Sequence, residues 1–226
     1  MSGTKINVAI VGASGYSGEE LVRLLLGHPH VNLSVLTSRQ YAGQPMTSVF
    51  PRFAGYAGAS DLVFSEPSID LLAEKAEAVF LALPHGVAAE FAVPLAERGV
   101  TVIDLSADFR LNDPTVYHEF YGAEHPAPEW LAKAVYGLPE IRRDAIANAT
   151  LIASPGCYPT SILLPLIPLL EAGLIDPGQI IADSLSGVSG AGRNASLPFL
   201  YVECNESLRP YGVPRHRHLS EIEQEL

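Results

Sequence analysis

The sequence is poor in cysteine, in basic residues and in long apolar runs, and each shortage excludes a class of protein. Its two cysteines, Cys157 and Cys204, allow at most one disulfide, too little to stabilise 226 residues and consistent with a reducing compartment. No CxxC or HExxH spacing occurs, so we expect no metal. Lysine and arginine total 14 against 25 acidic residues, with no basic cluster, so nucleic acid is not an expected partner.

Apolar residues are frequent but come in short runs. None approaches the roughly 18 residues of a membrane-spanning helix. The first dozen residues run straight into a predicted strand and lack the pattern of a secretory signal. We therefore expect no membrane partner and take the cytoplasm as the default location.

Short β-branched runs alternate with segments of helical periodicity through the first two thirds of the chain. The pattern predicts strands at residues 6–11, 33–36, 78–83, 100–105 and 150–153, and helices at residues 18–27 and 87–98. Continuous apolar strands are typical of a parallel sheet covered on both faces. We predict an α/β fold, with a doubly wound Rossmann domain over residues 1–155.

The rest of the chain is predicted to begin a second domain. Residues 112–138 are expected to be irregular with short helices, residues 159–173 helical, and residues 179–185 a strand. The sequence ends in a helical turn with Ser220 as the expected N-cap. Residues 156–226 are few for a self-sufficient core, so we expect an incomplete α+β domain and a truncated chain.

A glycine-rich turn follows the first strand and opens the first helix. Backbone N–H groups there can hold a pyrophosphate, which predicts a dinucleotide. The expected contacts in this turn are Gly12, Ser14, Gly15, Tyr16, Ser17 and Gly18.

The end of the second strand indicates which dinucleotide binds. NAD-binding domains place an acidic residue there for the ribose hydroxyls, but no acidic residue lies between Glu20 and Asp61. Ser38 and Arg39 stand there instead, and a hydroxyl with a guanidinium suits the 2′-phosphate of NADP.

Cys157 is the candidate nucleophile because it lies on a Pro-Gly turn just before a helix. Unpaired N–H groups at a helix start favour a thiolate, whereas Cys204 lacks this setting and is expected to be a packed thiol. A thiolate enzyme commonly needs an acid–base partner. His216 is the candidate, since it lies in an Arg-His-Arg-His run suited to an anionic substrate.

Further loops carry weaker signals. Gly187 and Gly190 belong to a second Gly/Ser-rich loop that could approach a cofactor closely, and the loop ends in Arg193. Pro84 and Arg110 follow strands at the sheet edge where α/β proteins bind ligands.

Together these segments resemble the N-acetyl-γ-glutamyl-phosphate reductase family of arginine biosynthesis. The shared motifs span nearly the whole chain in the family's order, and the most specific is PGCYPT; they are GASGYSG, TSR, LPHG, DLSADFR, YGLPE, SPGCYPT, SGVSGAGR, NES, PYGV and HRH.

The resemblance implies an NADPH-dependent enzyme in which Cys157 attacks an acyl phosphate, a thioester forms, and reduction releases the semialdehyde. It assigns proton transfer to His216. It leaves Arg110, Arg193 and His218 as candidate binders of substrate carboxylate or phosphate. Family members are longer than this chain, and a complete member is expected to be a homo-oligomer.

Several alternatives remain open. Related reductases act on carrier-bound glutamyl or aminoadipyl phosphate or on aspartate semialdehyde, although Tyr158-Pro159 after Cys157 favours the N-acetylglutamyl enzyme. A short-chain reductase is disfavoured because no tyrosine has lysine four residues later. A Cys-His thiol hydrolase would need no cofactor, and a non-catalytic NADP-binding protein would need no reactive cysteine.

Overall fold

The computed structural model describes residues 4–226 and divides into two compact units. The first unit comprises the chain up to Arg110 together with Pro126–Ser154, and the second comprises Leu111–His125 together with Pro155–Leu226. The segment Leu111–His125 thus groups with residues that follow it by thirty positions or more. The domain bounds of 1–155 and 156–226 stay a prediction.

The first unit is built on a seven-stranded sheet in the order β3-β2-β1-β4-β5-β7-β6. Every pair of neighbouring strands is parallel. The strands are β1 (Ile6–Val11), β2 (Val31–Thr37), β3 (Phe64–Ser65), β4 (Ala78–Leu81), β5 (Thr101–Asp104), β6 (Val135–Tyr136) and β7 (Leu151–Ala153). This parallel sheet confirms the predicted doubly wound α/β fold.

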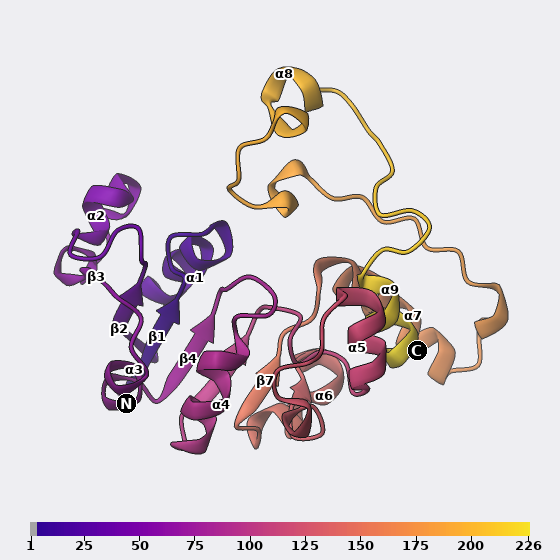
Figure 1. Cartoon of the computed structure of the whole chain (residues 1–226), viewed down its shortest axis with the longest axis horizontal. Helices are drawn as coiled ribbons and strands as arrows, with labels where there is room; N and C mark the ends of the chain where they lie inside the picture. The colour runs from indigo at the N-terminus through magenta and orange to yellow at the C-terminus, as the bar shows by residue number, and fades with distance from the viewer. Residues whose placement is uncertain (1–3) are drawn as a thin grey trace. The chain divides into compact units, whose positions relative to one another are not determined.

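Helices connect the strands and cover the sheet (Figure 1). In the first unit they are α1 (Tyr16–Leu26), α2 (Met46–Val49), α3 (Ile69–Lys75), α4 (Ala89–Glu97) and α6 (Pro139–Ala147). Capping defines some of their limits: Ser68 is the N-cap of α3, and its hydroxyl accepts the N–H of Leu71. Both predicted helices, α1 and α4, are present.

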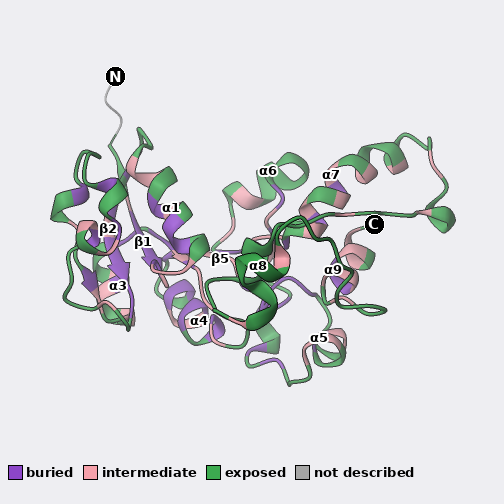
Figure 2. Cartoon of the chain, turned by 90° about the horizontal axis from the view of Figure 1, so that it is seen from above, coloured by how far each residue is buried: buried purple, intermediate pink, exposed green. Residues whose placement is uncertain are grey.

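The two faces of the sheet carry separate hydrophobic clusters. Along β1, Ala9 and Val11 pack into a cluster with α3 and α4, whereas Ile10 packs into a cluster with α1 and α2. Successive side chains of a strand point to opposite faces, so this alternation buries both. Figure 2 shows β1 and β2 as buried. Burial on both faces explains why these strands read as continuous apolar runs.

The second unit contains α5 (Pro114–Tyr121), α7 (Cys157–Glu171), α8 (Tyr201–Cys204) and α9 (His218–Glu225). The N-cap of α5 is Asp113, whose carboxylate accepts the N–H of Thr115 at 2.7 Å, and its C-cap is Gly122 with a φ of 72°. Helix α7 runs through Pro165 and Pro168, and α9 packs against it.

The predicted strand at residues 179–185 is wrong. Apart from a short 3-10 turn ending at Gln179, this segment has no regular structure, and Ile181 and Leu185 are 98% and 76% exposed. A strand exists only when it is hydrogen-bonded to a neighbour, and every sheet strand among residues 4–226 belongs to the first unit. The segment follows α7 as part of a long connection that leads through α8 (Figure 1).

Ser220 is also not the N-cap of the last helix. Helix α9 begins at His218, its N-cap is Arg217, and the Ser220 hydroxyl donates to the carbonyl oxygen of Arg217 at 2.9 Å. A serine in the first helical turn can bond backward in this way, which mimics the signal of a cap.

Candidate functional site

The glycine-rich turn between β1 and α1 is shaped by its backbone. Gly12 has a φ of +79°, and a Cβ at this position would overlap the carbonyl oxygen of Ala82. A Cβ on Gly18 would overlap the backbone of Gly12 and Ala13. Gly15 is the N-cap of α1 and makes no side-chain cap hydrogen bond, so no N-cap side chain occupies the first N–H groups of that helix.

The end of β2 lies next to this turn. The hydroxyls of Ser14 and Ser38 hydrogen-bond to each other at 2.9 Å, which joins the glycine turn to the segment that follows β2. Thr37 is buried, and its Oγ1 has no hydrogen-bond partner among residues 4–226. Arg39 is exposed, as are Tyr16 and Ser17 on the first turn of α1. The open turn and the unsatisfied hydroxyl fit a dinucleotide.

The segments that follow β4 and β5 are locked together. The buried carboxylate of Asp108 accepts the N–H of Gly86 at 2.7 Å and the N–H of Ala89 at 3.3 Å. In return, Nδ1 of His85 accepts the N–H of Ala107 at 3.0 Å. These bonds fix the turn that holds Pro84, which is exposed.

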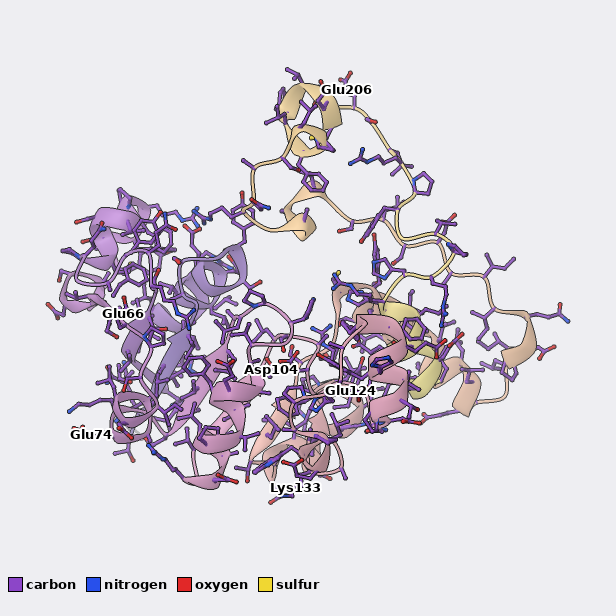
Figure 3. The ribbon with its side chains drawn as sticks, in the orientation of Figure 1. Glu66, Glu74, Asp104, Glu124, Lys133 and Glu206 are labelled. Carbon is purple, nitrogen blue, oxygen red and sulfur yellow. The ribbon has the colours of Figure 1, made fainter. Side chains whose placement is uncertain are left out.

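Asp104 and Arg110 are buried beneath that edge. Asp104, labelled in Figure 3, is fully buried and accepts hydrogen bonds from the N–H and the hydroxyl of Ser106. Burial raises the pKa of Asp104 to about 7, although the Ser106 bonds oppose the shift. The Arg110 guanidinium donates to the carbonyl oxygens of Ser154 at 2.7 Å and Leu105 at 2.9 Å. Arg110 therefore supports the backbone of two strand ends.

Cys157 is exposed and is the first residue of α7, two residues earlier than the helix predicted from the sequence. The N–H of Gly156, its N-cap, donates to the buried carboxylate of Glu221 at 2.8 Å. The ring of His218 packs on Gly156 so closely that a Cβ there would collide with it. Residues of α9 thus fix the turn that presents the thiol.

An aromatic cluster surrounds this turn within the second unit. The Tyr158 ring lies 5.2 Å from the His216 ring, which lies 5.1 Å from Tyr211 and 4.8 Å from His218. Burial, with the nearby Arg217 charge, lowers the pKa of His216. Burial, with Tyr158 and Cys157 close by, raises the pKa of Tyr211. Gly156 and Tyr158, the residues on either side of Cys157, therefore contact His218 and His216 respectively.

The second glycine-rich loop lies between α7 and α8 in the sequence. Gly187 and Gly190 lie at an exposed 3-10 turn of the second unit, and Arg193 follows, also exposed. Just before this loop, the hydroxyl of Ser184 bonds that of Ser161 on α7 at 2.8 Å. Cys204 lies in α8 and is half-buried, with its thiol near the carbonyl oxygens of Phe199 and Tyr201.

Sequence reasoning missed three residues of the thiol site. Tyr158 adjoins Cys157, and Tyr211 and Glu221 each lie within five residues of His216. Their nearness in sequence to predicted site residues was the available signal. Glu221 bonds Gly156 across 65 positions, a pairing that no local pattern reveals.

Two kinds of feature, a metal-binding cluster and a membrane-spanning helix, are absent from residues 4–226. Within residues 4–226, no group of three or more His, Cys, Asp or Glu side chains is placed to hold a metal ion. Over the same residues, no helix is both long enough and apolar enough to cross a bilayer.

Two family models match the chain in succession. Residues 7–149 match the semialdehyde dehydrogenase NAD-binding domain, and residues 157–226 match the semialdehyde dehydrogenase dimerisation domain. Both halves of the chain are therefore covered by one family.

Individual relatives agree. The chain is 61% identical over 223 residues to a protein of Akkermansia muciniphila named N-acetyl-gamma-glutamyl-phosphate reductase, covering 98% of this chain and 64% of that protein. It is 53% identical to a protein of the same name from Moorella thermoacetica, covering 98% of this chain and 63% of that protein. The chain thus spans somewhat less than two thirds of these relatives.

The fold also resembles solved structures. A crystal structure of aspartate semialdehyde dehydrogenase II from Vibrio cholerae matches with a TM-score of 0.56 and 23% identity, covering 75% of this chain and 47% of that one. At this identity the likeness shows a shared fold.

Proposed function

The chain belongs to the semialdehyde dehydrogenase family, and we propose that it carries the site that reduces N-acetyl-γ-glutamyl phosphate to N-acetylglutamate semialdehyde with release of phosphate. The observation that carries the proposal is the setting of Cys157. Its thiol is exposed at the start of a 15-residue helix, and the rings of His218 and His216 pack on the residues just before and just after it.

In this proposal Cys157 is the nucleophile. The sulfur of Cys157, as thiolate, attacks the acyl carbon while phosphate leaves with the bonding electrons. The product is a thioester on Cys157. His216 is the proposed acid–base partner of Cys157, because its ring contacts Tyr158, the residue next to the nucleophile.

The proposed cofactor is NADP, which supplies the hydride that reduces the thioester when it is bound. The glycine turn would hold its pyrophosphate against the start of α1. Ser38 and Arg39 would hold the 2′-phosphate, and no acidic residue between Glu20 and Asp61 opposes that charge. Pro84, Gly187 and Gly190 complete the proposed cofactor contacts.

The substrate is an anion, and three cationic or ionisable side chains are proposed to bind it: Arg110, Arg193 and His218. We also propose the domain bounds 1–155 and 156–226 and a homo-oligomeric state for the complete protein. The match of residues 157–226 to a dimerisation domain supports the proposed homo-oligomeric state.

The reaction run backwards tests the function. The protein is mixed with N-acetylglutamate semialdehyde, orthophosphate and NADP⁺, and the appearance of NADPH is followed by absorbance. We expect phosphate-dependent reduction of NADP⁺ that Cys157→Ser abolishes. Activity with aspartate semialdehyde but not with the N-acetylated compound would instead assign the chain to the enzyme that its structural neighbour represents.

A second candidate is a non-catalytic NADP-binding protein, because the glycine turn and the end of β2, which are joined by the bond between Ser14 and Ser38, need no reactive cysteine. NADPH fluorescence and iodoacetamide labelling separate the two. A reductase binds NADPH and labels at Cys157 faster than at Cys204 near neutral pH. A binding protein quenches or shifts NADPH fluorescence but labels the two cysteines at similar rates.

A further inference from the structure

Two arginines that precede α9 lie over aromatic rings of α5. The guanidinium of Arg215 lies over the Phe120 ring, 4.7 Å from the ring centroid, and also pairs with the carboxylate of Glu119. The guanidinium of Arg217 lies over the Tyr121 ring at 5.6 Å. Both distances are within the roughly 6 Å over which a cation is attracted to an aromatic face. Consecutive residues at the end of α5 therefore hold both arginines.

The histidines that alternate with these arginines contact the start of α7. The His216 ring lies 5.2 Å from the Tyr158 ring, and the His218 ring packs on Gly156. Gly156 and Tyr158 are the residues on either side of Cys157. Both histidines are half-buried, whereas both arginines are exposed. This run of four residues thus divides its side chains between two helices, the arginines on α5 and the histidines at the start of α7.

Helix α5 is itself anchored within the second unit. Tyr121 stacks on Tyr117 with ring centroids 4.8 Å apart, and the buried Tyr117 contacts the buried His125 at the same distance. Just before α5, the N–H of Asn112 donates to the side-chain oxygen of Gln224 in α9 at 2.7 Å. Figure 1 and Figure 2 both show α5 beside α9. The helix that carries the aromatic rings is therefore a fixed support for the residues that precede α9.

An arginine pair next to two histidines also suits an anionic substrate, but the contacts of the guanidinium groups favour another role. Each guanidinium faces an aromatic ring of α5, and that of Arg215 has a carboxylate partner as well. A carboxylate at this distance weakens the attraction of the same guanidinium for a second anion. The arginines are thus better placed to hold the backbone between them than to bind substrate.

We propose that Arg215 and Arg217 are positioning residues, which hold the chain between them on α5. The inference rests on the proposed function, in which His216 is the acid–base partner of Cys157. The contacts of the two arginines with α5 keep the His216 ring against the residue that follows the nucleophile. A misplacement of about 1 Å at a catalytic group can cost about 100-fold in rate, so α5 can control turnover without contacting the substrate.

Nuclear magnetic resonance tests the positioning without any reaction. In chain labelled with ¹³C-histidine and ¹³C-tyrosine, we expect NOE cross-peaks between the ring protons of His216 and Tyr158, assigned by their loss in His216→Gln. The cross-peaks should weaken or vanish when Phe120→Leu and Tyr121→Leu are combined, because leucine has no aromatic face. The matched control combines Phe120→Tyr with Tyr121→Phe, which exchanges the two rings but keeps both, and its cross-peaks should persist.

Substitution of the arginines tests the same contacts from the exposed side. Arg215→Met combined with Arg217→Met keeps unbranched side chains of similar length and removes both guanidinium groups, so the cross-peaks should again weaken. Arg142→Met is the control, since Arg142 is an exposed arginine of the first unit that lies over the Tyr136 ring at 5.7 Å. Because the replaced arginines are exposed, this variant tests the proposal even if the leucine pair fails to fold.

Kinetics of the reverse reaction separate positioning from substrate binding. For positioning, we expect kcat of the methionine pair to fall by roughly 10- to 100-fold, with little change in KM for orthophosphate or for the semialdehyde. The leucine pair on α5 should reproduce this fall. A raised KM with kcat retained in the methionine pair, and no effect of the leucine pair, would assign the arginines to substrate binding and overturn the proposal.

The remaining outcomes distinguish this inference from the proposed function. If the wild-type chain does not turn over, the proposed function fails, while the cross-peaks still decide whether α5 positions His216. If the wild-type chain turns over but its cross-peaks and kcat are unchanged in both the methionine pair and the leucine pair, the positioning role is wrong and the proposed function stands.

Discussion

The buried carboxylate of Glu221 accepts the backbone N–H of Gly156, the residue before Cys157, at 2.8 Å. Glu221 lies in the first turn of α9, where the helix dipole favours a negative charge. One side chain thus caps the start of α7 and joins it to α9. The thiol-bearing turn depends on a residue at the far end of the chain.

Replacing Glu221 should loosen that turn. Glu221→Ala leaves a buried N–H without its acceptor, which costs about 1–3 kcal/mol. We expect faster amide hydrogen exchange in the peptide that contains Gly156. Glu223→Ala, on the exposed side of the same helix, is the matched control and should change stability by less than about 0.5 kcal/mol. Equal exchange in the two variants would show that the bond does not hold the turn.

Gly12→Ala should destabilise the first unit strongly. The position combines a φ of +79° with a Cβ that would overlap the Ala82 carbonyl oxygen, so both strain and collision oppose the change. Thermal unfolding should show a clear fall in midpoint. Gly15→Ala is the comparison, because its Cβ would meet the nearest atom at an ordinary 3.6 Å, and its midpoint should stay near wild type. Similar midpoints for both would contradict the model of the turn.

Arg39→Ala should weaken NADPH binding selectively. Charge-assisted hydrogen bonds contribute about 1.5–3 kcal/mol, so the Kd for NADPH should rise roughly 10- to 150-fold while that for NADH stays nearly unchanged. Fluorescence titration measures both constants. Arg98→Ala is the control, since Arg98 is an exposed arginine of the same unit that pairs with Asp70. A parallel loss for NADPH and NADH would mean that Arg39 does not contact the 2′-phosphate.

The raised pKa of Asp104 makes the free energy of unfolding depend on pH. Burial raises the pKa of Asp104 to about 7, so the folded chain keeps a proton that the unfolded chain releases above its ordinary value of 3.8. Folded stability from this group therefore falls as pH rises through that window, and the loss is complete above the folded pKa. In Asp104→Asn, the free energy of unfolding should decrease less between about pH 5 and about pH 8, by up to a few kcal/mol. Denaturant titrations at several pH values measure the free energy of unfolding. Parallel pH profiles for wild type and Asp104→Asn would contradict the raised pKa of Asp104.

The sequence predicted those elements of the fold whose signals are local. Strands β1, β2, β4, β5 and β7 were predicted because burial on both faces makes them continuous apolar runs. The two-residue strands β3 and β6 were missed, since two residues cannot display a period. Residues 179–185 include two adjacent β-branched residues, Ile180 and Ile181, but such residues do not supply the neighbouring strand that a ladder needs.

The candidate site likewise combines local sequence patterns with contacts between segments that are distant in sequence. Glycines on a strand–turn–helix and a cysteine on a Pro-Gly turn are local patterns, and the structure shows why Gly12 and Gly18 must lack a Cβ. The contact of Asp108 with Gly86 and that of Glu221 with Gly156 join segments 22 and 65 positions apart. Such contacts depend on how helices pack, which sequence periodicity does not specify.

The most direct test of the thioester on Cys157 is a mass measurement made without cofactor. The chain is mixed briefly with freshly prepared N-acetyl-γ-glutamyl phosphate, quenched in acid and analysed intact and after proteolysis. We predict one added N-acetylglutamyl group per chain, located on Cys157, released by hydroxylamine and absent in Cys157→Ser. An unmodified chain, or modification of Cys204 at the same rate, would contradict the central claim.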